Sequence, residues 1–153
     1  TFNMAGWRLA FAAGNARMIE ALNLIQDHLF VGIFPALQEA GIAALLDPKS
    51  EEAVAQLNAT YDSRRDAFVQ AATKIGWKAF PSKGSFYAWM PVPEGYTSES
   101  FVDLLLEKAH VAVAPGKGFG PAGDAYVRIG LLVEPERLVE AVGRIANLQL
   151  FNN

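Results

Sequence analysis

One long amphipathic segment constrains the fold more than any other feature of the sequence. It opens at Asp47-Pro48, a typical helix start, because Asp can cap free amides and Pro fits the first helical position. Apolar residues then recur every three or four positions until Gly76, a typical helix end, and form a stripe of about seven turns. Such a stripe can pack against a sheet, so the chain needs strands elsewhere.

Shorter segments on both sides of this helix alternate between strand and helix patterns. The strand patterns are residues 9–14, 77–80, 85–90, 111–114 and 125–133. Segments 77–80 and 85–90 are separated by the turn-rich Pro81-Ser82-Lys83-Gly84, which favours a hairpin. Other helix starts fall at Asn15, Pro35, Thr97 or Ser98, and Pro135. This order predicts an α/β or α+β fold, with helices covering a small sheet.

Composition narrows the class of protein. Of the 153 residues 52% are hydrophobic, which argues against disorder, and no apolar stretch approaches the length needed to span a bilayer. The net charge of −3 supplies no basic field for nucleic acid or an anionic membrane. With no cysteine and two histidines, a metal site is not expected. We expect a globular cytoplasmic protein without nucleic-acid or membrane partners.

A glycine-rich stretch at residues 115–123 is the first candidate functional feature. No Ser or Thr follows Lys117, and the stretch leads into a strand, so it does not match a nucleotide-binding P-loop. Its glycines permit positive φ angles and close approach of the backbone to another surface or to a ligand.

Arg128 lies in the middle of the apolar strand pattern that follows these glycines. A guanidinium there needs an anionic partner to offset desolvation. Two partners are open: one of the 16 acidic residues of the chain, or the carboxylate of a ligand, which the planar fork of Arg matches bidentately. The adjacent glycine-rich stretch favours the ligand.

Arg8 ends an unusual opening string, Thr1-Phe2-Asn3-Met4-Ala5-Gly6-Trp7-Arg8. Taken alone, Arg8 could be a surface residue. The string as a whole resembles the segment that follows the pyridoxal-phosphate lysine in class I/II, fold type I, aminotransferases. By that register the Schiff-base lysine would directly precede Thr1, so the resemblance implies that none of the catalytic residues lies in this chain.

Three further stretches resemble the same family, in the expected order. They are Gly84-Ser85-Phe86-Tyr87-Ala88-Trp89, the glycine-rich stretch with Phe119, and Tyr126-Val127-Arg128-Ile129-Gly130. The resemblance covers essentially the whole chain. Within the family, stretches such as Pro93-Glu94-Gly95-Tyr96-Thr97-Ser98-Glu99 are most similar to bacterial methionine-salvage aminotransferases.

The resemblance implies a role for three side chains. Arg8 would pair with the phosphate of the cofactor pyridoxal 5'-phosphate, Arg128 would grip the substrate α-carboxylate, and Phe119 would lie near the substrate side chain. Residues 1–34 would be a remnant of the large cofactor-binding domain, and residues 35–153 the C-terminal small domain. The whole enzyme would move an amino group between an L-amino acid and a 2-keto acid as a homodimer, and the isolated chain would be inactive.

A hypothesis from another class remains beside this one. The chain could be a self-sufficient, non-catalytic module that binds a small molecule or a protein. For the enzyme as a whole, the methionine-salvage resemblance implies a thioether 2-keto acid as acceptor and points to glutamine as donor.

Overall fold

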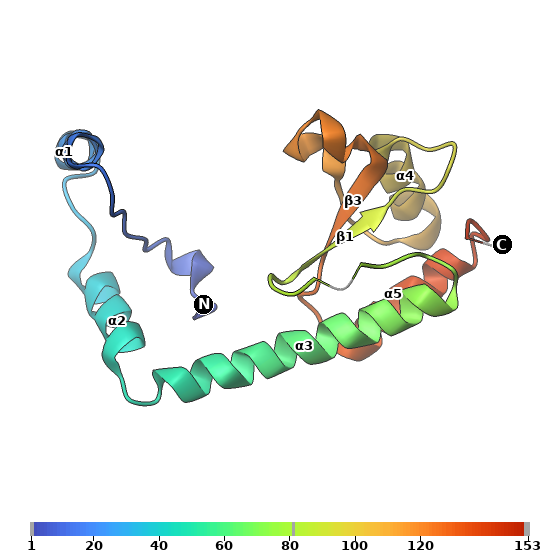
Figure 1. Ribbon diagram of the computed structural model, residues 1–153, viewed down its shortest axis with the longest axis horizontal. Helices are drawn as coiled ribbons and strands as arrows, with labels where there is room; N and C mark the ends of the chain where they lie inside the picture. Colours follow the sequence, from blue (N-terminus) through green and yellow to red (C-terminus); the bar gives the residue numbers. More distant parts are fainter. Residues whose placement is uncertain (1, 81, 152–153) are drawn as a thin grey trace. The chain divides into compact units, whose positions relative to one another are not determined.

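The computed structural model describes residues 2–80 and 82–151. Thr1 of the opening string and Pro81 of the expected turn lie outside the described residues. The chain divides into two compact units, residues 1–58 and residues 59–153. The helices and the strands β1 and β3 are labelled along the chain in Figure 1.

The first unit is helical. α1 (Ala16–Ile25) continues as one π-helical turn, Gln26–Phe30, and α2 (Pro35–Leu46) follows. The expected start at Asn15 is confirmed, because its side chain accepts a hydrogen bond from the Arg17 amide at 3.0 Å. The start expected at Asp47-Pro48 is a turn that precedes the helix, and α3 (Ser50–Lys74) begins just after it and runs into the second unit.

The strand expected at residues 9–14 is wrong. This segment has no regular structure, and the side chain of Phe11 is 87% exposed. A strand needs a neighbour for its backbone amides and carbonyls. The sheet of the described residues contains three strands, all of them in the second unit, and none pairs with residues 9–14.

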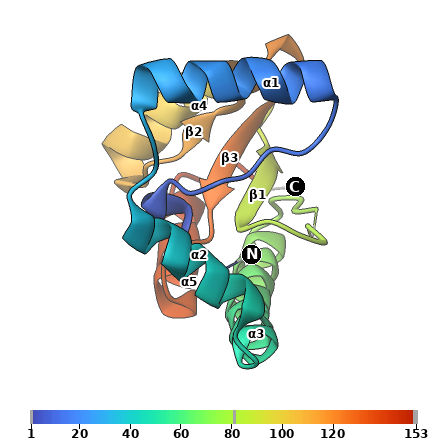
Figure 2. The same ribbon diagram turned by 90° about the vertical axis from the view of Figure 1, so that its left-hand side faces the viewer.

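The second unit is built on a small antiparallel sheet. Its strands are β1 (Tyr87–Pro91), β2 (Ala114–Pro115) and β3 (Tyr126–Gly130). β3 lies between the other two, as Figure 2 shows. Trp89 pairs with Arg128 across β1 and β3, and Ala114 pairs with Arg128 from the other side. Arg128 therefore occupies the centre of the sheet.

Helices cover one face of this sheet. α4 (Ser98–Leu104) extends as a π-helical turn, Leu105–Ala109, and α5 is the helix Pro135–Ala146. These helices and the second half of α3 share one hydrophobic core with the sheet. The buried residues of that core are Phe68, Ala72, Trp77, Ala88, Met90, Phe101, Leu105, Ala109, Val127, Ile129, Leu131, Leu138, Val142 and Ile145. The expected α+β fold, a small sheet covered by helices, is confirmed.

The expected hairpin between residues 77–80 and 85–90 is wrong, because β1 pairs with β3. Trp77 explains why its segment is not a strand. Its ring is 1% exposed and stacks on Phe151 at 5.0 Å, and its indole N–H donates to the Pro91 carbonyl at 2.8 Å. The segment fills the core with a side chain instead of extending the sheet.

The long apolar stripe is buried only along its second half. Phe68 and Ala72 are in the core, whereas Val54 and Leu57 are only half-buried. Within the described residues, no helix is both long and apolar enough to cross a membrane. The division into units at residue 58 reflects packing within this chain, and the domain boundary expected between residues 34 and 35 stays a prediction.

Candidate functional site

The sheet face opposite the helices carries the candidate site. In β3, Val127 and Ile129 point into the core, so Tyr126 and Arg128 alternate onto the other face. In β1, Ala88 and Met90 are buried in the same way, which leaves Tyr87 and Trp89 on the face of Arg128. Two short strands thus present one cation among aromatic rings.

The guanidinium of Arg128 contacts two aromatic rings, that of Tyr87 on β1 and that of Phe119 in the glycine-rich stretch. Its carbon Cζ is 4.1 Å from the centre of the Tyr87 ring and 4.2 Å from the centre of the Phe119 ring. Both distances are well inside the range of cation–π attraction. Because two rings restrict the side chain, less conformational entropy is lost when the guanidinium binds an anion.

Arg128 has no ion pair with a carboxylate among the residues that the structure describes. The sequence left two partners open, an acidic residue of the chain and a ligand carboxylate. The described residues show no pairing of Arg128 with an acidic residue. The aromatic rings contact the guanidinium without accepting conventional hydrogen bonds from it. The N–H groups of Arg128 suit a carboxylate, which can accept two parallel bonds from the guanidinium.

Phe119, the third expected site residue, is brought to Arg128 by the glycine-rich segment. It ends a short 3-10 helix, Gly116–Phe119, and its side chain is 53% exposed. Its ring also contacts Trp89 edge-on at 5.8 Å. Trp89 in turn stacks on Tyr126 at 5.7 Å. Phe119 therefore joins the aromatic surroundings of Arg128.

Close backbone contact explains two of the glycines. A Cβ atom on Gly123 would lie 2.0 Å from the Gly116 carbonyl oxygen, and one on Gly116 would lie 2.2 Å from the Gly123 oxygen. The expected close approach is thus made between two turns of the same segment, Gly116–Phe119 and Pro121–Ala125. Gly120, between these turns, has the expected positive φ of 125°.

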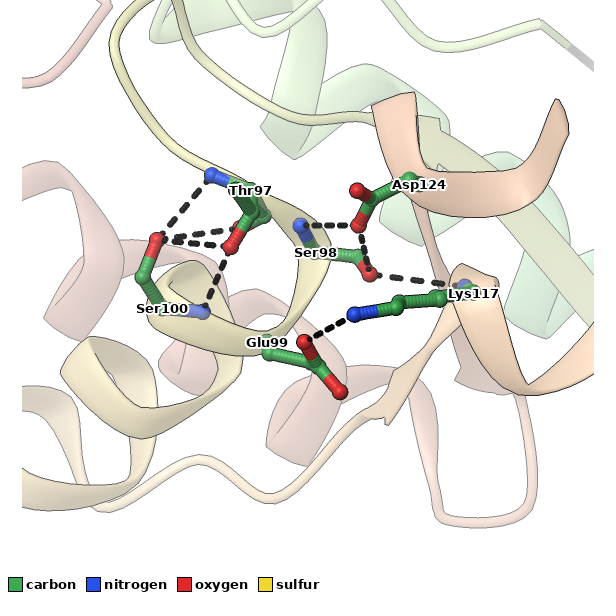
Figure 3. Close-up of polar contacts among 6 residues, drawn as sticks. All are labelled: Thr97, Ser98, Glu99, Ser100, Lys117 and Asp124. Carbon is green, nitrogen blue, oxygen red and sulfur yellow. Dashed lines mark hydrogen bonds and ion pairs between the residues drawn. The ribbon is translucent and has the colours of Figure 1, made fainter. Parts of the chain in front are cut away.

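Polar contacts tie both turns to the start of α4 (Figure 3). The fully buried Ser98 donates its hydroxyl to Asp124 Oδ1 at 2.8 Å, and its backbone N–H donates to the same oxygen at 3.2 Å. The Lys117 amide donates to Ser98 Oγ at 3.4 Å, and Lys117 Nζ pairs with Glu99 at 2.7 Å. The hydrogen bonds from Ser98 lower the pKa of Asp124 below its ordinary value of 3.8.

Arg8, the expected phosphate-binding residue, belongs to the first unit. It follows the 3-10 turn Ala5–Trp7 and adopts the left-handed region at φ 57°. Its side chain is exposed, and its Nη1 donates a hydrogen bond to the Ala5 carbonyl at 3.5 Å. No carboxylate of the described chain pairs with Arg8. An exposed cation without a carboxylate partner fits the phosphate group of pyridoxal phosphate.

The sequence did not reveal Tyr87, Ser98 or Asp124 as site residues. Tyr87 is part of a recognised aromatic stretch, but its contact with Arg128 depends on the pairing of β1 with β3. Ser98 was expected only as an alternative cap of α4, whereas Thr97 is the cap and Ser98 bonds to the glycine-rich segment. In the described residues, no group of three or more His, Asp or Glu side chains could hold a metal ion.

Comparisons with known proteins identify the family of the chain. Residues 1–145 match the family described as aminotransferase class I and II. The L-glutamine–4-(methylsulfanyl)-2-oxobutanoate aminotransferase of Bacillus subtilis is 60% identical over 151 residues, which are 99% of this chain and 37% of that protein. The LL-diaminopimelate aminotransferase of Moorella thermoacetica is 46% identical over 94% of this chain and 36% of its own length.

A solved structure shows the same fold. The structure of apo-BacF from Bacillus subtilis superimposes with a TM-score of 0.92 at 46% sequence identity, over 100% of this chain and 39% of BacF. The chain thus spans less than two fifths of the length of these relatives. Members of the matched family use pyridoxal phosphate, and their substrates are amino acids and keto acids. On this sequence match and this fold, the chain belongs to the class I and II aminotransferases.

Proposed function

We propose that this chain forms the part of a pyridoxal-phosphate-dependent aminotransferase that holds the substrate α-carboxylate through Arg128. One observation carries the proposal: the Arg128 guanidinium contacts the rings of both Tyr87 and Phe119, with no carboxylate of the described residues paired to it. The family match over residues 1–145 favours this function over a self-sufficient binding module.

Arg128 suits an α-carboxylate for two physical reasons. Arginine stays protonated at any pH at which an enzyme works, so the binding charge persists throughout turnover. Its planar fork offers two parallel N–H groups, which fix both the position and the orientation of the carboxylate. A fixed carboxylate limits the positions open to the rest of the amino acid, and such limits favour reaction.

Arg8 would hold the cofactor phosphate in the complete enzyme. Its exposed guanidinium, free of carboxylate partners in the described chain, can donate to phosphate oxygens. When bound, pyridoxal phosphate supplies an electron sink for the bonds at the substrate α-carbon. In this division of labour, Arg8 binds the cofactor and Arg128 binds the substrate, and neither moves a proton.

Phe119 would form a wall beside the bound substrate. Its side chain is 53% exposed and packs on Arg128, so an amino acid held by the guanidinium would pass close to its ring. An apolar wall stabilises an apolar substrate side chain by removing its surface from water. A thioether also makes favourable contacts with aromatic rings.

The relative that is 60% identical supports a particular substrate pair. The name of that enzyme gives L-glutamine as amino donor and 4-(methylsulfanyl)-2-oxobutanoate as acceptor. We propose the same pair, and with it a role in methionine salvage, for the enzyme to which this chain belongs. We further propose that this enzyme works as a homodimer in the cytoplasm, and that residues 1–34 belong to its large domain and residues 35–153 to its small domain.

The test uses the complete product of the gene that encodes this chain. Purified with pyridoxal phosphate, it should convert 4-(methylsulfanyl)-2-oxobutanoate to methionine with L-glutamine as donor. Arg8→Gln should weaken cofactor binding, and Arg128→Lys should raise the KM for the amino donor while cofactor binding stays the same. A protein that transfers no amino group across a panel of amino acids and keto acids would refute the proposal.

A further inference from the structure

We propose that Ser98 and Asp124 are positioning residues that hold Phe119 against Arg128, and so set the orientation of the carboxylate-binding guanidinium. The polar contacts among Ser98, Lys117 and Asp124 in Figure 3 have no part in the function proposed above. The proposal rests on that proposed function for the step from guanidinium orientation to substrate affinity.

Core packing alone does not fix the Phe119 ring. Its side chain is 53% exposed, and its ring contacts are Arg128 at 4.2 Å and Trp89 at 5.8 Å. An exposed aromatic side chain keeps its place only if its backbone is held. The position of the glycine-rich segment therefore decides whether the second ring lies on the guanidinium.

One buried hydroxyl holds this segment on both sides of Phe119. Ser98 Oγ accepts from the Lys117 amide, two residues before Phe119, and donates to Asp124, five residues after it. The Ser98 backbone N–H donates to the same oxygen of Asp124. The two short turns, already in backbone contact at Gly116 and Gly123, are thereby fastened to α4 as one body.

The buried hydrogen bonds of Ser98 and the exposed ion pair of Lys117 contribute differently to stability. Ser98 is fully buried, so removing its partner leaves an unsatisfied hydroxyl and amide away from water. The Lys117–Glu99 ion pair is exposed, with side chains 52% and 58% accessible, and such pairs contribute little. Glu99 therefore provides a matched control at the neighbouring position.

Loss of the Ser98–Asp124 hydrogen bonds would leave the Arg128 guanidinium in contact with the Tyr87 ring alone. The guanidinium would then sample more orientations, and binding a carboxylate would restrict more motion. From the range measured for single cation–π contacts, affinity for the substrate carboxylate should fall by roughly 2- to 30-fold.

Nuclear magnetic resonance of the 153-residue chain tests the positioning directly. Two rings flanking Arg128 should shift its Nε–H and Cδ–H proton resonances strongly upfield, and Phe119 ring protons should show nuclear Overhauser effects to Arg128. Arg128→Lys assigns these resonances, and Phe119→Leu should remove the part of the shift due to Phe119. Ser98→Ala and Asp124→Ala should reproduce that loss while the core methyl resonances stay dispersed.

Three conservative variants serve as controls. Asp124→Asn keeps an oxygen that accepts from Ser98 and should retain the upfield shift. Glu99→Gln removes only the exposed ion pair. Ser100→Ala removes a capping contact of α4 with Thr97 and leaves Ser98 and Asp124 in place. All three should resemble the unmodified chain.

The proposal is overturned if Ser98→Ala leaves the Arg128 resonances and the Phe119 contacts unchanged. It is equally overturned if Ser100→Ala abolishes them, because fraying of α4 would then explain the effect. Should Asp124→Ala fail to fold, Ser98→Ala alone decides. In the complete gene product, Ser98→Ala should raise the KM for the amino donor with cofactor affinity unchanged. Absence of amino transfer there would refute the proposed function and leave the resonance result standing.

Discussion

The two units of the chain differ in how their apolar side chains are placed. In residues 2–58 none is buried, and the α1 stripe remains open, with Met18 68% and Leu22 49% exposed. In the described part of residues 59–153, helices and a sheet enclose one dense core. Both units contain regular helices, yet only the second buries them. Within this chain, only the second unit therefore supplies a packed core that can hold a site rigid.

The candidate site follows this difference. Arg128 and Tyr87 stand on strands whose alternate residues are in the core, so their backbones are fixed from below. Arg8 stands in a segment without buried residues. We therefore expect the substrate-binding arginine to be fully preorganised in this chain and the phosphate-binding arginine to be less so.

The largest difference in the free energy of unfolding is expected between two truncations to alanine, one of a buried core ring and one of an exposed apolar side chain. Phe101 is fully buried and packs on Trp77, so Phe101→Ala should lower the free energy of unfolding by about 3–5 kcal/mol. Leu22→Ala, on the exposed face of α1, should change it by less than about 0.5 kcal/mol. Urea unfolding followed by near-ultraviolet circular dichroism measures both. Equal losses would show that the first unit shares the cooperative core.

A pair of glycines makes the next contrast. Gly123→Ala would force a backbone shift, because the new Cβ would lie 2.0 Å from the Gly116 oxygen, and should cost about 1–3 kcal/mol. Gly14→Ala has nothing within 4 Å and should be nearly neutral. The same urea titration compares them. If Gly123→Ala proves neutral, the two turns are not packed as described.

Relief of backbone strain should give a smaller effect. Ser85 has a φ of 74° directly before β1, and Val31 has a φ of 61°. Left-handed strain of about 1–2 kcal/mol, less the roughly 0.4–1 kcal/mol of added chain entropy, predicts that Ser85→Gly stabilises the protein by about 0.5 kcal/mol. Val31→Gly relieves similar strain outside the core, so the cooperative transition should not move. If Val31→Gly raised the stability of the cooperative transition and Ser85→Gly did not, the comparison between the two units would be reversed.

The smallest expected effect is the pH dependence of the hydrogen bonds between Ser98 and Asp124, which hold the glycine-rich segment. The folded pKa of Asp124 lies below its ordinary value of 3.8, since Ser98 donates two hydrogen bonds to the carboxylate. Its stabilisation is therefore complete above about pH 4 and is lost as the pH falls through the folded pKa. The Tm difference between the unmodified chain and Asp124→Asn should shrink as the pH is lowered. A constant difference would show that Asp124 does not titrate with folding.

Local chemistry made the helices predictable. Asn15 caps α1, Pro35 and Pro135 open α2 and α5, and Thr97 caps α4, as their residue types indicate. Strand pairing was harder to predict from the sequence, because β1 pairs with a strand nearly forty residues further along the chain. The apolar pattern at residues 77–80 is compatible both with a strand and with an irregular segment that buries a side chain in the core. The structure shows the second, because Trp77 is buried in the core.

The candidate site shows the same limit. Arg128 stood out from the sequence because a cation in an apolar strand needs a partner. Phe119 was expected near the substrate through family resemblance, and its contact with Arg128 adds a physical reason. Tyr87 escaped notice because only the register that places Trp89 opposite Arg128 also brings Tyr87 onto the same face. Contacts that depend on register cannot be derived before the pairing is known.

The most direct test of the account asks whether Arg128 recognises a carboxylate. In the complete gene product, the dissociation constants of an amino acid and of the amine that lacks only its carboxylate should be compared before and after Arg128→Lys. Loss of the fixed fork should weaken binding of the amino acid by roughly 10- to 100-fold and leave binding of the amine unchanged. Equal weakening of both ligands, or of neither, would contradict the assignment of Arg128.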